Sequence, residues 1–171
     1  LSDYRGKVTL VQFWHSNCQG CQAEVPALDK LAGVLEGAKF EILPIALSTD
    51  SQTDIDRFYR QKGIRNLEVM RDRTSFVFNN LAPKHPRLNA QATPTTLLID
   101  ANGDALGAYV GVAGWEQPAG RALLDYYIFG SNLSFKMERL RMTRRMSSSP
   151  SSASASSFIS RRNVIAAGAG G

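Results

Sequence analysis

Two cysteines separated by two residues, Cys18 and Cys21, are the strongest chemical signal in this 171-residue chain. They are its only cysteines. One closely spaced pair does not hold a fold together, so we expect a catalytic role, with a structural pair or a metal clip as the alternative. Sulfurs at this spacing can approach closely enough to form a disulfide. In thiol–disulfide exchange, one thiolate attacks a partner disulfide and the second thiol resolves the mixed intermediate.

The residues on either side of this pair predict a strand that leads directly into a helix. Residues 8–14 are an apolar, β-branched and aromatic run of strand length, and residues 22–35 carry apolar side chains at helical spacing. The pair would then lie at a helix N-terminus, where the positive end of the dipole favours a thiolate. We expect Cys18, the more exposed position, to be the nucleophile and Cys21, one turn into the helix, to be the resolving thiol.

Glu24 follows Cys21 by three residues, which places both on one face of the predicted helix. A half-buried carboxyl group beside a thiol has a raised pKa and can take the proton of Cys21 as the disulfide opens. The alternative is an acidic residue in the first helical turn that the dipole favours. We expect Glu24 to be the proton acceptor.

The remaining pattern predicts an α/β fold in which a mixed sheet is covered by helices on both faces. Pro26 predicts a kink or irregular first turns in the first helix, and Pro44 is unusual inside a buried strand. Asn102-Gly103 between two apolar runs predicts a β-hairpin. The predicted strands are 8–14, 40–47, 67–70, 95–100 and 105–110, and the predicted helices are 22–35, 53–62, 74–81 and 115–128.

The formal net charge of +5 is concentrated in the C-terminal part of the chain. Residues 1–130 carry a net charge of −1 and residues 131–171 one of +6. We therefore expect no nucleic-acid partner for the folded part. Residues 131–160 are basic and then serine-rich, which predicts a linker or a disordered tail. Residues 161–171 begin with two arginines followed by small apolar residues, which resembles the start of a twin-arginine export signal, with a basic disordered tail as the alternative.

Residues 13–26 resemble the active-site segment of the TlpA/ResA branch of thioredoxin-like proteins, which reads F-W-x-x-W-C-x-x-C-x-x-E-x-P. The matching positions are Phe13, Trp14, Cys18, Cys21, Glu24 and Pro26. The chain departs from this pattern at Asn17, where the branch usually has tryptophan, and at Gln19-Gly20, where proline is common. A second segment, residues 92–103, resembles the cis-proline strand and hairpin of the family. The resemblance extends over residues 1–128 and implies a thioredoxin-like fold.

The resemblance also implies that Pro94 is a cis-proline that faces the cysteine pair, with an ordinary turn proline as the alternative. Cis peptide bonds before proline are rare, so the resemblance alone supports this expectation. Such a proline would leave the backbone of Thr93 free to hydrogen-bond an extended partner peptide. It would also block metal capture by the dithiol. The other expected contacts to a partner are Trp14, Asn17, Gln19 and Gly20.

Three of these positions carry further expectations. Trp14 belongs to the hydrophobic core by default. Asn17 cannot cover the cysteine pair as a tryptophan ring would, so we expect Cys18 to be unusually open to solvent or to a partner. Gly20 lacks the rigidity of proline, so we expect the dithiol to rearrange more easily.

The resemblance implies a thiol-disulfide oxidoreductase that acts in the periplasm or elsewhere outside the cytoplasm and reduces cysteines in partner proteins. Members of this branch often serve cytochrome c or oxidase assembly. The implied partners are a protein with a disulfide or thiol pair and an upstream thiol–disulfide electron donor, and no cofactor is expected. Family members usually carry further strands before the position of Leu1, and a secretory signal or membrane anchor before those. We therefore expect the domain at 1–130 to lack its N-terminal strands and any membrane anchor to lie outside the given residues.

A copper-handling binding protein is the alternative function. His15 and His85 would complete a Cys₂His₂ set of ligands that copper or zinc accepts. Their spacing matches no closed zinc pattern and Pro94 opposes it, so we expect no metal site. Gln22 stands where a C-x-x-C-H haem attachment motif needs histidine. A peroxiredoxin would carry a proline and a hydroxyl residue where this chain has Val11 and His15.

Overall fold

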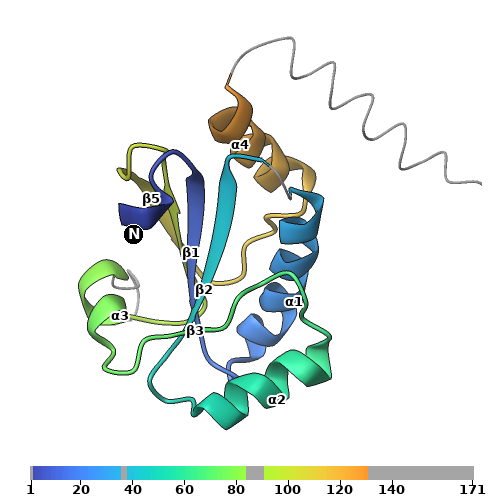
Figure 1. Ribbon diagram of the computed structural model, residues 1–171, viewed down its shortest axis with the longest axis vertical. Coiled ribbons are helices and arrows are strands. Elements are labelled where there is room, and N and C mark those ends of the chain that lie inside the picture. Colours follow the sequence, from blue (N-terminus) through green and yellow to red (C-terminus); the bar gives the residue numbers. More distant parts are fainter. Residues whose placement is uncertain (1, 36–37, 84–90, 131–171) are drawn as a thin grey trace, which may run out of the picture. The chain divides into compact units, whose positions relative to one another are not determined.

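The computed structural model describes residues 2–35, 38–83 and 91–130, and these form a mixed sheet in the strand order β3-β2-β1-β4-β5 (Figure 1). Its strands are β1 (Val8–Trp14), β2 (Phe40–Ala46), β3 (Met70–Arg71), β4 (Thr95–Ile99) and β5 (Ala105–Val110). The helices are a 3-10 turn (Ser2–Tyr4) and α1 (Gln19–Val34), α2 (Gln52–Lys62), α3 (Phe76–Leu81) and α4 (Pro118–Phe129).

β1 is the central strand and leads directly to the cysteine pair. It pairs in parallel with β2 and antiparallel with β4, and all of its residues are buried. A strand covered on both faces needs an almost continuous apolar run, which is the pattern from which it was predicted. Gln12 is the exception in the middle of this strand, and it lies opposite Thr96 of β4.

Pro44 is accommodated in β2 because its backbone nitrogen faces an open edge. The carbonyl of Ala46 accepts a hydrogen bond from Asp72 N on the side of β2 that faces away from β1. Backbone groups alternate sides along a strand, so Pro44, two residues before Ala46, faces the same side. Within the described residues β2 pairs with β3 only at Ile45 and Ala46. Pro44 therefore breaks no ladder bond, which explains why the strand tolerates it.

Apolar side chains cover both faces of the sheet, as predicted. On one face Leu10 and Trp14 of β1 pack with buried residues of α1, α2 and α4. On the other face Val11 and Phe13 pack with residues of β2 and β4, and α3 and the N-terminal 3-10 turn contribute partly buried side chains. A shift of β1 by one residue would exchange its two faces and would move Gln12 away from Glu24 of α1.

Local signals set most element ends within a few residues of the prediction. Ser51 and Asp54 form a capping box at the start of α2, and Gly63 ends that helix with a φ of 67°. α4 begins at Pro118, in its first turn, rather than at Trp115. β3 has two residues instead of the predicted four.

The predicted hairpin is confirmed as β4 and β5, which pair antiparallel. The Asp100 carboxylate accepts hydrogen bonds from the backbone N–H groups of Asn102 and Asp104, which holds the turn.

Among the described residues, no helix is both long enough and apolar enough to span a membrane. The expectations for residues 131–171 and for His85 lie outside the described part of the chain.

Candidate active site

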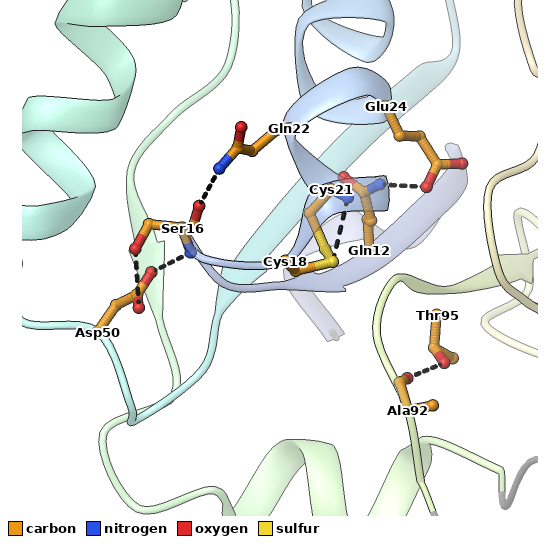
Figure 2. The surroundings of a disulfide bond; sticks show 9 residues. All are labelled: Gln12, Ser16, Cys18, Cys21, Gln22, Glu24, Asp50, Ala92 and Thr95. Atoms are coloured by element: carbon orange, nitrogen blue, oxygen red, sulfur yellow. Dashed lines mark hydrogen bonds between the residues drawn. A yellow bond between two sulfur atoms is a disulfide. The ribbon is translucent and has the colours of Figure 1, made fainter.

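Cys18 and Cys21 form a disulfide at the start of α1 (Figure 2). Their Cα atoms are 5.1 Å apart, and the backbone N–H of Cys21 donates a hydrogen bond to Cys18 Sγ at 3.1 Å. Cys18 is the N-cap residue, so its sulfur takes the place of the side-chain oxygen that usually accepts a free N–H at this position. A thiolate at Cys18 in the reduced protein is therefore stabilised by this N–H group and by the helix dipole.

The exposure of the two cysteines follows the predicted order, but neither is open to solvent. Cys18 is 8 % exposed and Cys21 is fully buried, whereas the neighbouring Asn17 is exposed. The expectation that Asn17 leaves Cys18 unusually open is therefore wrong. The physical reason is the capping role of Cys18, which turns its sulfur over the first helical turn and away from solvent.

The loop before Cys18 is anchored by a buried carboxylate from another part of the chain. Asp50, in the loop after β2, accepts hydrogen bonds from Ser16 N at 2.6 Å and from Ser16 Oγ at 3.1 Å. The carbonyl of Ser16 accepts a third bond from Gln22 Nε2 of α1 (Figure 2). These bonds fix the backbone two residues before Cys18.

Glu24 lies on α1 beside the disulfide and is 2 % exposed. Its carboxyl group accepts hydrogen bonds from Gln12 Nε2 at 2.9 Å and from the backbone N–H of Ala113 at 3.0 Å. Burial raises the pKa of Glu24 above its ordinary value, and the Ala113 and Gln12 donors offset part of that increase. The buried indole nitrogen of Trp115 has no hydrogen bond of normal geometry, although it is close enough to favour the charged carboxylate.

The peptide bond between Thr93 and Pro94 is cis, as the resemblance implied. The ring of Pro94 lies against Gly20 of α1, because a Cβ atom added to Gly20 would come within 3.1 Å of Pro94 Cδ. The same added atom would come within 2.8 Å of Cγ2 of the exposed Val112 side chain, so an alanine at position 20 would force that side chain to move. The segments around Pro94 and Val112 are joined by a hydrogen bond from Gly111 N to the carbonyl of Pro94.

One of the expected partner contacts is wrong. The side chain of Trp14 is fully buried and its ring packs against Phe58 and Tyr59 of α2, so it belongs to the core and is closed to a partner. The other expected contact residues, apart from Pro94, are exposed or half-buried. Asn17 and Gln19 are exposed, Gly20 and Thr93 are half-buried, and Pro94 is buried.

The described residues do not assemble the alternative metal site. Among them, no group of three or more histidine, cysteine or acidic side chains is placed to hold a metal ion. His15 is half-buried in the loop before Cys18, and the second histidine of that hypothesis, His85, lies outside the described residues.

Three residues of this site were not singled out from the sequence. Gln12 had a visible signal, because it is a large polar residue in an apolar strand predicted to be buried on both faces. Asp50 and Val112 had none, because they reach the cysteine pair only through the tertiary fold.

A mixed sheet, a disulfide at a helix N-terminus and a cis-proline packed against the same helix define a thioredoxin-like protein. The sequence profile of the AhpC/TSA family matches residues 1–105, and the chain belongs to that family. The thiol-disulfide oxidoreductase ResA of Geobacillus kaustophilus is 31 % identical over 104 residues, which are 61 % of this chain and 55 % of that protein.

Solved structures show the same fold. A thioredoxin family thiol:disulfide interchange protein of Chlorobium tepidum superposes with a TM-score of 0.62 at 20 % identity, covering 74 % of this chain and 83 % of the other. The exposed lipoprotein thioredoxin Etrx1 of Streptococcus pneumoniae superposes with a TM-score of 0.60 at 24 % identity, covering 72 % and 87 %. The chain spans about half the length of the curated relatives it matches.

Proposed function

We propose that this protein is a thiol-disulfide oxidoreductase that reduces disulfides in partner proteins. The observation that carries the proposal is the Cys18–Cys21 disulfide at the N-terminus of α1, with Glu24 buried on the same helix. The matching ResA proteins are named for thiol-disulfide oxidoreductase activity, which supports the same chemistry here.

In the proposed cycle, the Cys18 thiolate attacks one sulfur of the partner disulfide. The partner bond breaks, a mixed disulfide forms, and the other partner sulfur leaves as a thiolate. Cys21 then gives its proton to Glu24 and attacks Cys18 Sγ, so that the Cys18–Cys21 bond forms and the second partner thiolate leaves. The partner gains two electrons, and the proton on Glu24 passes to solvent or to the departing thiolate. An upstream dithiol donor restores the reduced pair.

The partner is proposed to bind across the residues that surround the disulfide. An extended peptide would hydrogen-bond the backbone of Thr93 next to Pro94, which is a form of strand addition. Asn17, Gln19 and Gly20 would contact the same peptide at the start of α1. The exposed side chain of Val112 supplies an apolar contact beside Gly20.

We further propose an extracytoplasmic setting, in the periplasm or an equivalent space, with service in cytochrome c or oxidase assembly as the specific role. The resemblance to the TlpA/ResA branch supports this setting. Residues 1–130 would form the catalytic domain, residues 131–160 a linker, and residues 161–171 a signal-like or disordered tail. A membrane anchor would belong to a part of the protein outside the given residues.

Insulin reduction with a dithiol donor tests the activity. We expect turnover by the wild-type protein and no turnover above the uncatalysed rate for Cys18→Ser. Cys21→Ser should instead accumulate a mixed disulfide through Cys18, because the resolving thiol is missing. Wild-type protein without insulin reduction would contradict the proposal.

Metal analysis of the same preparations separates this function from copper handling. The oxidoreductase proposal expects less than stoichiometric copper or zinc in the reduced wild-type protein. Stoichiometric copper that is lost in Cys18→Ser, together with absent turnover, would support the binding-protein alternative.

A further inference from the structure

Gln12 places a buried amide in direct contact with the proposed proton acceptor. It lies in the middle of the central strand β1 and is fully buried. Its Nε2 donates to Glu24 Oε2 at 2.9 Å. Its carbonyl oxygen Oε1 is also buried and has no hydrogen-bond partner within the described residues. An unsatisfied buried carbonyl is costly, so its retention in a core strand calls for a physical reason.

The surroundings of Glu24 supply donors for a carboxylate but offer a carboxylic acid few acceptors. The backbone N–H of Ala113 donates to Glu24 Oε1, and an N–H group cannot accept a proton in return. The indole N–H of Trp115 is also a donor only. When Glu24 takes up a proton, its new O–H group must find an acceptor or remain unsatisfied in the core.

Gln12 Oε1 is the buried acceptor that can serve this O–H group. A side-chain amide carries a donor and an acceptor at nearly identical positions, and a half-turn about its last bond exchanges them. After that turn, Gln12 Oε1 would accept from Glu24 Oε2–H, and Gln12 Nε2 would take the place now held by the unpartnered carbonyl. One hydrogen bond joins the two side chains in each state.

We propose that Gln12 is a positioning residue that holds Glu24 in one place in both protonation states, by donating to its carboxylate and accepting from its acid. This inference rests on the proposed role of Glu24 as proton acceptor for Cys21. Proton uptake then requires a rotation of the Gln12 amide in place of a new acceptor for the Glu24 O–H group.

Few other titratable groups face Glu24. Cys21 precedes it by three residues on the same helix and titrates only when reduced. Glu116, in the segment before α4, adds a negative charge that raises the pKa of Glu24 further. The residue of β1 that contacts Glu24 is the uncharged Gln12, so replacing it changes the hydrogen bonding of Glu24 without changing the nearby charge.

The test is Gln12→Met, which keeps the size of the side chain and removes both polar atoms. Thr96→Val is the matched control, because Thr96 is buried opposite Gln12 on β4 and its hydroxyl has no hydrogen-bond partner in the described residues. The pKa of Glu24 is read by ¹³C NMR of its carboxyl carbon in the oxidised proteins, with Glu24→Gln to assign the signal. The carbonyl stretch of protonated Glu24 is read by infrared difference spectroscopy.

We expect Gln12→Met to raise the pKa of Glu24 by about one pH unit, because the hydrogen bond that the carboxylate loses is stronger than the one that the neutral acid loses. The carbonyl stretch of the protonated acid should move to higher wavenumber, because its O–H loses its acceptor. Thr96→Val should change neither. An unchanged pKa would overturn the donor part of the proposal, and an unchanged stretch would overturn the acceptor part.

Kinetics separate a failure of this inference from a failure of the proposed function. The pH at which resolution of the Cys18 mixed disulfide reaches half its maximal rate should rise in Gln12→Met by the same amount as the Glu24 pKa. If Glu24→Gln resolves the mixed disulfide at the wild-type rate, Glu24 is not the proton acceptor. This holds even if the NMR and infrared changes show that Gln12 and Glu24 are hydrogen-bonded in both protonation states. If Glu24→Gln is slow and Gln12→Met leaves the pKa of Glu24 unchanged, only the role of Gln12 is wrong.

Discussion

Helix α1 buries two carboxyl groups, and the protein satisfies them in different ways. Asp29, in the second half of the helix, accepts hydrogen bonds from the backbone N–H groups of Arg65 at 2.9 Å and Asn66 at 2.6 Å, and from Asn66 Nδ2 at 3.2 Å. Glu24, near the disulfide, accepts one backbone N–H from Ala113 and one side-chain amide from Gln12. Both side chains are almost fully buried.

The difference fits the structural and the chemical role that we propose for the two ends of this helix. The donors to Asp29 are mostly fixed in the backbone, so these hydrogen bonds tie α1 to the segment after α2. Glu24 accepts fewer hydrogen bonds and has a raised pKa. Its neighbour Gln12 has a side-chain amide whose donor and acceptor exchange places by a half-turn. We infer that the Asp29 end of the helix stabilises the fold and the Glu24 end handles a proton.

A pair of isosteric substitutions, Glu24→Gln and Asp29→Asn, tests this separation most strongly. Loss of a general base slows the assisted step by about 10²-fold or more, so Glu24→Gln should slow resolution of the mixed disulfide by that factor. Asp29→Asn should leave the rate within about twofold, because Asp29 has no role in proton transfer. Single-turnover release of thiol from a Cys18 mixed disulfide measures both, and equal slowing in the two variants would contradict the comparison.

Stability should respond in the opposite order. Asp29→Asn should lower the free energy of unfolding by about 1–3 kcal/mol, because its new NH2 group would face the donor Asn66 Nδ2 and the backbone donors would lose a charged acceptor. Chemical denaturation of the oxidised proteins measures this loss. A stability equal to that of the wild type would show that the Asp29 hydrogen bonds do not tie α1 to its neighbour.

The pH dependence of stability should identify Glu24. Its pKa in the folded protein is raised above the ordinary 4.5, so the folded state holds the proton more tightly than the unfolded state. Wild-type stability should therefore fall, relative to Glu24→Gln, as pH rises from about 4.5 through the folded pKa. Between low and neutral pH, the free energy of unfolding of the wild type should fall relative to that of Glu24→Gln. The expected fall is about 1.4 kcal/mol for every tenfold difference in the proton affinity of Glu24 between the folded and unfolded states.

Denaturation of the oxidised wild-type and Glu24→Gln proteins across this range measures the difference without interference from the thiols. Thr96→Val, which removes no titratable group, is the control at each pH. If the difference in free energy of unfolding between the wild type and Glu24→Gln does not change with pH, Glu24 titrates alike in the folded and unfolded states.

The smallest expected effects come from adding a methyl group at each end of the helix. Gly20→Ala meets Val112 and Pro94, and Gly33→Ala meets the side chain of Asn66 at 3.1 Å. Each should change stability by less than about 1 kcal/mol, because the helical preference of alanine offsets the crowding. Only Gly20→Ala should lower kcat/KM for insulin, by up to about tenfold, because it displaces the surface beside the disulfide. Gly20→Ala combined with Val112→Ala should recover part of this loss, and equal loss in Gly33→Ala would contradict the assignment.

Local sequence signals predicted much of the fold because they act over a few residues. The apolar run of β1, the helical spacing within residues 53–62 and the turn at Asn102-Gly103 each specify their own element. The cysteine pair was predicted at a helix start for the same reason. The start of α1 was placed late because the pattern did not reveal that Cys18 itself caps the helix.

The surroundings of the pair could not be predicted in the same way. Trp14 was expected both in the core and among the partner contacts, and its packing against α2 bears out the first and excludes the second. Asn17 was expected to leave Cys18 open, and the inward turn of the sulfur decides otherwise. Both outcomes depend on how elements pack, which no single segment encodes.

The sequence by itself determined a strand, two cysteines and a helix in that order, since hydrophobic period and residue spacing are properties of adjacent residues. Only the tertiary structure decided which groups surround Glu24. Gln12 precedes it by twelve residues and Ala113 follows it by 89, so their contacts exist only once β1, α1 and the segment before α4 pack together. That packing removes water from the carboxyl group, and removal of water is what raises its pKa.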